Sequence, residues 1–192
     1  MGKIVCFGDS NTYGYDPVTM RYGAADRWVD LLAGMQAREV INMGQNGRTI
    51  PDGSFAERLS GVMESGDRLL IMLGSNDLLL EGKPAAVAAA RMEDFLLALQ
   101  ATFAYEAPKA KAGPEIILIS PPPMKRGFWV TDDNTVEESY KVAGLYKALA
   151  DKMNIGFADA GTWGVELTCD GVHFTETGHH KFAEGIYKHL SL

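Results

Sequence analysis

The stretch Lys3–Ser10, KIVCFGDS, joins a short apolar run to a polar turn that contains glycine. Such a short apolar run is typical of a strand that is buried on both faces of a sheet. We therefore expect a strand over Lys3–Phe7, with Gly8, Asp9 and Ser10 at the point where it ends.

The same pattern returns along the chain. Apolar runs that we expect to form strands follow at Val40–Asn42, Arg68–Leu73, Glu115–Ile119 and Ile155–Phe157. Apolar residues recur at helical spacing after Asp26, after Pro84, after Thr135 and near the C-terminal end. Thr135 with Glu138 fits a capping box at the start of the third of these helices. Repeated strand–helix alternation predicts parallel strands with helical crossovers, and hence a three-layer α/β/α sandwich of about five strands.

Size and charge narrow the function classes. The chain has 192 residues, which suits a single domain over 1–192. It carries 18 Lys and Arg against 25 Asp and Glu, a formal net charge of −7, which argues against nucleic acid and anionic membranes as partners. No apolar run approaches the ~18 residues of a membrane span or forms the core of an export signal. We expect a cytoplasmic protein; the alternative is an export signal removed from this sequence.

Cysteine and histidine give little sign of a metal site. Cys6 and Cys169 each stand alone, so we expect reduced thiols with structural roles, because free cysteine often packs as a small hydrophobe. His179, His180 and His189 fall on the last helix, and the adjacent pair points in different directions. For these three we expect a solvated surface rather than metal binding.

The polar segments after the strands hold groups suited to acyl transfer. In parallel sheets the ligand site lies beyond the carboxyl ends of the strands. Ser10 lies at such an end and is the candidate nucleophile, which needs a base within hydrogen-bond reach. His173 is the candidate base, and Asp170, three residues earlier, can orient its ring and stabilise the imidazolium.

A tetrahedral intermediate also needs hydrogen-bond donors for its oxyanion. The candidates are the backbone N–H groups of Ser10 and Gly47 and the side-chain amide of Asn76, with Gly44 as an alternative to Gly47. Each of these residues is also an ordinary turn residue when taken alone. Their joint placement at successive strand ends is what indicates a catalytic site.

Four blocks of the chain resemble the GDSL, or SGNH, hydrolase family. They are FGDSNT at 7–12, NMGQNGRT at 42–49, LGSND at 73–77 and DGVH at 170–173, in the order of the family. The resemblance implies a flavodoxin-like α/β/α fold and an esterase or acylhydrolase that uses no metal or other cofactor. It also implies that Ser10 is the nucleophile, His173 the base, Asp170 its partner, and Gly47 and Asn76 oxyanion donors.

Further segments resemble the small arylesterase and acetylesterase branch of that family, in which homo-oligomers are frequent. They are Gly14, Arg27-Trp28 and Ser120–Pro123. The branch suggests short-chain esters of aryl alcohols or acetylated carbohydrates as small-molecule substrates, hydrolysed through an acyl-enzyme. The alternatives are a lysophospholipase or thioesterase acting on longer acyl chains, and a non-catalytic carbohydrate-binding protein of the same fold.

Residues near these blocks are candidates for substrate binding. Asn11 stands where many family members have Leu or another apolar residue, a departure that concerns the pocket lining. Arg48 follows the oxyanion glycine and either contacts an anionic substrate group or reaches solvent. Phe128 and Trp129 form an apolar pair on a long loop, which suits a pocket wall or an oligomer contact.

Overall fold

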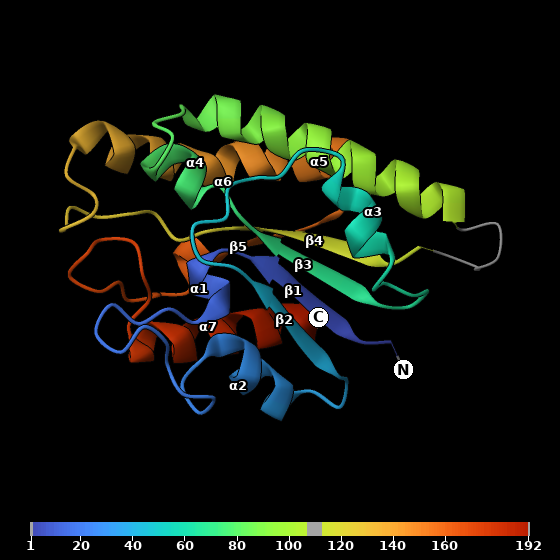
Figure 1. Ribbon diagram of the computed structural model, residues 1–192, viewed down its shortest axis with the longest axis horizontal. Coiled ribbons are helices and arrows are strands. Elements are labelled where there is room, and N and C mark those ends of the chain that lie inside the picture. Colours follow the sequence, from blue (N-terminus) through green and yellow to red (C-terminus); the bar gives the residue numbers. More distant parts are fainter. Residues whose placement is uncertain (1, 107–112, 192) are drawn as a thin grey trace.

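The apolar runs of the sequence form one parallel sheet. In the computed structural model, which describes residues 2–106 and 113–191, the strands are β1 Ile4–Gly8, β2 Val40–Gly44, β3 Arg68–Met72, β4 Glu115–Ser120 and β5 Gly156–Asp159. Their order across the sheet is β2-β1-β3-β4-β5, and each neighbouring pair is parallel (Figure 1). This is the flavodoxin-like strand order, so the predicted fold class is confirmed.

Helices cover both faces of the sheet, as the alternating pattern predicts (Figure 1). One face carries α2 (Trp28–Met35) and α7 (Glu176–Leu190). The other carries α3 (Phe55–Ser60), α5 (Ala85–Glu106) and α6 (Asp133–Met153). Three short elements each follow a strand directly, namely α1 (Ser10–Tyr13), α4 (Ser75–Leu79) and the 3₁₀ turn η2 (Ala160–Thr162).

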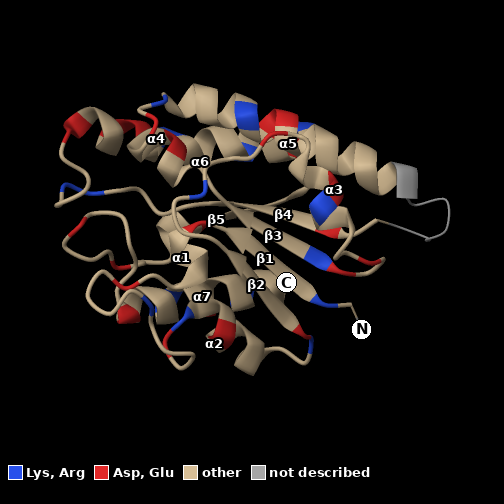
Figure 2. Ribbon diagram, in the orientation of Figure 1, with Lys and Arg blue, Asp and Glu red and all other residues tan. Residues whose placement is uncertain are grey.

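The strands are apolar on both sides because each side meets a layer of helices. On β1, Val5 and Phe7 pack into the core beneath α3, α5 and α6, whereas Ile4 and Cys6 pack toward α2 and α7. Charged residues occur in the strands only at an end, such as Arg68 at the start of β3. Figure 2 shows the charges on helices, loops and strand ends, around an uncharged middle of the sheet.

The start of α6 differs from the predicted capping box. The N-cap is Asp132, whose carboxylate accepts from the N–H of Thr135 at 2.8 Å, so the helix begins at Asp133. The carboxylate of Glu138 accepts instead from the N–H of Ala85 at 2.6 Å, at the start of α5. A helix does begin near Thr135, as the pattern predicts, but Glu138 accepts from a backbone N–H of the neighbouring helix α5 rather than from the start of its own helix.

The strand register brings the polar segments to one edge of the sheet. Gly8, the last residue of β1, pairs with Gly44 of β2 on one side and with Met72 of β3 on the other. α1 therefore begins between the turn after β2 and the start of α4. A Cβ atom at Gly44 would stand 2.1 Å from the backbone nitrogen of Tyr13. Glycine is needed there because α1 lies directly against β2.

Candidate active site

Ser10, His173 and Asp170 form a continuous chain of hydrogen bonds at the carboxyl edge of the sheet. Ser10 is the first residue of α1, and Asp9 caps that helix by accepting from the N–H of Asn11 at 2.9 Å. Ser10 Oγ lies 2.9 Å from His173 Nε2, and His173 Nδ1 lies 2.7 Å from Asp170 Oδ2. The tertiary structure thus brings together three side chains that the sequence singles out, two of them 163 residues apart.

Asp170 is held as a carboxylate by its surroundings. Burial acts to raise its pKa, but hydrogen bonds from the His173 ring and from the backbone N–H groups of His173 and Val172 outweigh burial and hold the pKa below its usual range. Both N–H groups point at Asp170 Oδ1, at 3.0 and 2.9 Å. An ionised Asp170 favours the tautomer of His173 with its proton on Nδ1, which leaves Nε2 free to accept the proton of Ser10.

Gly47 and Asn76 lie beside Ser10 in the same pocket. Gly47 has a φ of 71°, and a Cβ atom built there would meet no other atom within 4 Å, so its role differs from the close-packing role of Gly44. Asn76 lies in the first turn of α4, where its Nδ2 donates to the backbone oxygen of Arg48 at 3.0 Å. That bond fixes the amide and leaves its second hydrogen for another acceptor.

The pocket is small and has aromatic walls. It encloses about 330 Å³ and is lined by Ser10, Tyr15, Asn46, Gly47, Asn76, Leu80, Trp129 and His173. The centroid of the Tyr15 ring lies 4.6 Å from that of the His173 ring. The Trp129 ring meets the His173 ring edge-on, with 5.1 Å between their centroids. The sequence predicts Trp129 as a pocket residue but does not indicate Tyr15, Asn46 or Leu80, because the lining of a pocket depends on how separate loops meet, which no local pattern shows.

The other substrate-binding candidates do not line this pocket. Asn11 is buried, and its amide bonds to the backbone of Val172 and Phe174. The Arg48 guanidinium donates to the oxygens of Gly8 and Met43, at the ends of β1 and β2, and lies over the Phe7 ring at 4.3 Å. The guanidinium also donates to Gln45 Oε1 at 3.0 Å on the exposed side, so Arg48 is partly buried and partly solvated, and its contact with an anionic substrate group stays a prediction.

Phe128 also lies away from the pocket. Its side chain is 80% exposed, whereas Trp129 beside it lines the pocket and is 51% exposed. Backbone bonds from Phe128 to Cys169 and from Trp129 to Asp170 attach this loop to the segment that precedes His173. Of the two adjacent residues, Phe128 therefore faces solvent and Trp129 faces the site.

His179 and Cys169 differ from the sequence prediction. His179 is buried against the rings of Tyr22 and Phe174, and the N–H of Trp28 points at its Nδ1 at 3.4 Å. Burial lowers the pKa of His179 to about 3, so the predicted solvated position is wrong for this residue. Cys6 is buried as expected, but Cys169 is exposed, so the packing argument fails for Cys169.

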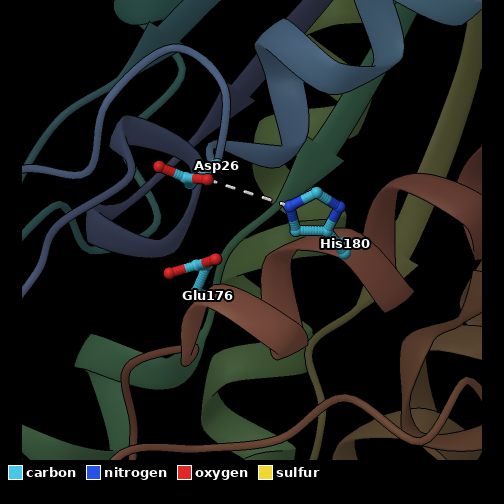
Figure 3. A group of neighbouring side chains, drawn as sticks. All are labelled: Asp26, Glu176 and His180. Atoms are coloured by element: carbon cyan, nitrogen blue, oxygen red, sulfur yellow. Dashed lines mark ion pairs between the residues drawn. The ribbon is translucent and has the colours of Figure 1, made fainter.

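A second group of titratable side chains lies near the start of α7. Asp26, Glu176 and His180 place one potential ligand atom each within 4.8 Å of the others (Figure 3). His180 Nε2 forms an ion pair with Asp26 at 3.9 Å, and the His180 side chain is 46% exposed. None of these residues lines the pocket of Ser10.

Residues 6–181 match the model of the GDSL-like lipase/acylhydrolase family. The chain belongs to this family. The protein is therefore an esterase or acylhydrolase, in agreement with the resemblance of its four sequence blocks. As a carboxylic ester hydrolase it acts on small-molecule esters.

Solved structures with the same fold include esterases. A carbohydrate acetylesterase family member from Sinorhizobium meliloti is 29% identical, with a TM-score of 0.86 over 99% of this chain and 97% of that one. The native aryl esterase of M. smegmatis is 27% identical, with a TM-score of 0.84 over 100% of this chain and 99% of that one. The carbohydrate acetylesterase Est24 of S. meliloti, at 24% identity and a TM-score of 0.88 over 100% and 99% of the chains, supports the fold.

One curated relative is the uncharacterised lipoprotein YqeF of Bacillus subtilis. It is 34% identical over 85 residues, which span 42% of this chain and 35% of the lipoprotein. No helix in the described part of this chain is long and apolar enough to cross a membrane. The cytoplasmic location expected from the sequence stays a prediction.

Proposed function

We propose that the protein hydrolyses short-chain carboxylic esters through an acyl-enzyme formed on Ser10. The observation that carries the proposal is the hydrogen-bonded chain from Ser10 Oγ through the His173 ring to Asp170, which opens into a small pocket. A serine hydroxyl becomes a useful nucleophile when a base is placed within hydrogen-bond reach and is itself oriented by a third group.

In acylation, Ser10 Oγ bonds to the ester carbonyl carbon while His173 Nε2 takes the hydroxyl proton. The carbonyl oxygen gains negative charge and accepts from the N–H groups of Ser10 and Gly47 and from the amide of Asn76. The carbon–oxygen bond to the alcohol then breaks, and His173 gives its proton to the leaving oxygen. Asp170 stabilises the charged ring between these two transfers.

In deacylation, a water molecule attacks the acyl carbon and gives its proton to His173. The bond to Ser10 Oγ breaks, the proton returns to Ser10, and the free acid leaves. Every bond change is balanced by Ser10, His173, Asp170 and water, so the proposed reaction needs neither a metal nor another cofactor.

The pocket favours a small acyl group. Its volume of about 330 Å³ is at the lower end of the range for ligand pockets, and Leu80 and Trp129 are among the residues that line it. Aryl alcohols and carbohydrates are the proposed alcohol portions of the ester, as the names of the M. smegmatis and S. meliloti structures suggest.

A phosphonate probe that reacts with activated serine tests the mechanism. We expect one adduct, located at Ser10 by mass spectrometry, and labelling of a His173→Ala variant that is at least 100-fold slower. An adduct at another residue, or equal labelling rates in the two proteins, would contradict the proposed roles.

A series of p-nitrophenyl esters separates the alternatives. We expect kcat/KM to be greatest for acetate or butyrate. A maximum at eight carbons or more would instead support a lysophospholipase or thioesterase. Carbohydrate binding without hydrolysis, equal in the wild type and in Ser10→Ala, would support a non-catalytic binding protein.

A further inference from the structure

We infer that Asn11 is a positioning residue that holds His173 in register with Ser10. The inference rests on the proposed function, because it assigns the role of Asn11 within the Ser10–His173 pair. Asn11 follows Ser10 in α1, is 3% exposed, and does not line the pocket. Asn11 therefore affects the reaction by holding other residues in position, not by contact with the substrate.

The amide of Asn11 pairs with the backbone on both sides of His173. Its Nδ2 donates to the oxygen of Val172 at 3.0 Å, and its Oδ1 accepts from the N–H of Phe174 at 3.0 Å. Both bonds are buried. The side chain thus binds the segment around His173 as a neighbouring β-strand would, with one donor and one acceptor.

The remaining polar atoms of the two peptide units that flank His173 bond within their own loop. The N–H of His173 donates to Asp170 Oδ1 at 3.0 Å, and its carbonyl accepts from the N–H of Thr168 at 2.7 Å. These bonds shape the loop but do not attach it to α1. Among the described hydrogen bonds, those from α1 to residues 172–174 are the two of Asn11 and the Ser10–His173 contact itself.

Asn11 is itself held firmly. Its N–H donates to Asp9 Oδ1 at 2.9 Å, and its backbone oxygen accepts from Trp28 Nε1 at 3.0 Å. Trp28 is 1% exposed and packs against Phe182 of α7. The link therefore runs from the core through Asn11 to the backbone of Val172 and Phe174 on either side of His173, so the His173 ring is placed relative to a rigid part of the molecule.

Leucine at this position would keep nearly the same shape and remove both hydrogen bonds. The oxygen of Val172 and the N–H of Phe174 would then be buried without partners, and the loop would shift to satisfy them. A misplacement of about 1 Å between reacting groups costs about 100-fold in rate. Because Asn11 does not touch the pocket, KM should be little changed.

The test compares Asn11→Leu with the wild type on p-nitrophenyl acetate, below the unfolding transition of both proteins. We expect kcat to fall by about 10- to 100-fold with KM within about twofold. The downfield NMR signal of the proton between His173 and Asp170 should persist, because both residues belong to the loop that moves. A kcat within twofold of the wild type would overturn the inference, and so would a lower kcat accompanied by loss of this signal, which would show that the loop itself had come apart.

Two further variants complete the test. Asp67→Leu removes hydrogen bonds to the N–H groups of Lys3 and Glu64 at the opposite end of the sheet, so it should lower thermal stability and leave kcat unchanged. If Asn11→Leu does not fold, Asn11→Asp at pH 8 keeps an acceptor for Phe174 and loses the donor to Val172. We expect at least a fivefold lower kcat for it, and wild-type turnover would overturn the inference. Failure of the proposed function itself is distinguishable, because Ser10→Ala would then remain active.

Discussion

Asn76 is fixed before any substrate arrives, since its Nδ2 already donates to the backbone oxygen of Arg48. A donor that is held in place costs no reorganisation when the oxyanion forms. We predict that Asn76→Ala lowers kcat by about 100- to 1000-fold, with a much smaller change in KM. Steady-state kinetics on p-nitrophenyl acetate measure this. A loss below about fivefold would show that Asn76 is not an oxyanion donor.

His179 should make stability depend on pH. Its pKa is lowered to about 3 in the folded protein by burial, against about 6.5 in an unfolded chain. Above pH 6.5 the ring is neutral in both states. As the pH falls below 6.5, the unfolded state takes up a proton that the folded state does not, so the free energy of unfolding decreases. For this residue alone, we predict a loss of about 2 kcal/mol between pH 7.5 and pH 5.

Urea unfolding of the wild type and of His179→Leu at these two pH values isolates that contribution. The variant should lose about 2 kcal/mol less than the wild type. Burial raises the pKa of Asp9 to about 6, which gives a contribution of opposite sign, present below about pH 4 and lost as the pH rises through 6. Asp9 is unchanged in the variant, so it cancels in the comparison. Equal losses in the two proteins would contradict the prediction.

At the scale of an element, the start of α6 depends on one side chain. Asp132 accepts from the backbone N–H of Thr135, and N-cap residues of this kind stabilise a protein by about 1 kcal/mol. We predict that Asp132→Ala lowers the free energy of unfolding by about that amount. Asp133→Ala is the matched control, because the Asp133 side chain is 82% exposed and pairs with Arg126 at 3.5 Å rather than with the helix backbone. Equal effects in urea unfolding would argue against the cap.

The loop that precedes α6 offers a second comparison of neighbours. Trp129 lines the pocket and Phe128 does not. We predict that Trp129→Ala raises kcat/KM for hexanoate relative to acetate by about 10-fold, because it removes a wall next to the acyl group. Phe128→Ala should leave the ratio unchanged. The same p-nitrophenyl series measures the hexanoate-to-acetate ratio of kcat/KM for both variants. Equal ratios in the two variants would show that Trp129 does not limit the length of the acyl group.

At the scale of the whole molecule, two cores share one sheet. Phe95 packs in the core under α5, and Phe182 packs on the opposite face under α7. Because each strand contributes to both cores, we predict one cooperative unfolding transition for the chain. Phe95→Ala and Phe182→Ala should each lower the free energy of unfolding of the chain by about 3–5 kcal/mol. Two separate transitions in calorimetry, each shifted by one variant, would contradict this.

The fold class and the candidate triad were predictable because they depend on patterns that the sequence carries locally. A strand that is buried on both faces must be apolar, so the apolar run in Lys3–Phe7 predicts a strand. The alternation of such runs with long helices predicts that the strands are parallel. The candidate nucleophile and the candidate base were predicted from residue type and from their positions in the polar segments that follow the first and the last strand. α1, α3 and α4 were not predicted, because elements of so few residues show no helical period.

The tertiary structure alone decided which side chains face one another. Nothing near Asn11 in the sequence reveals that its amide binds the backbone around His173, and nothing near His179 reveals that Tyr22 and Phe174 bury it. The physical reason is that hydrophobic periodicity reports burial along one element, whereas hydrogen bonds and ring contacts at the edge of the sheet join segments from opposite ends of the chain. The sequence by itself determined the layers of this hydrolase and which side chains are candidates for its chemistry. Only the packing of those layers decided which other residues hold these side chains in position.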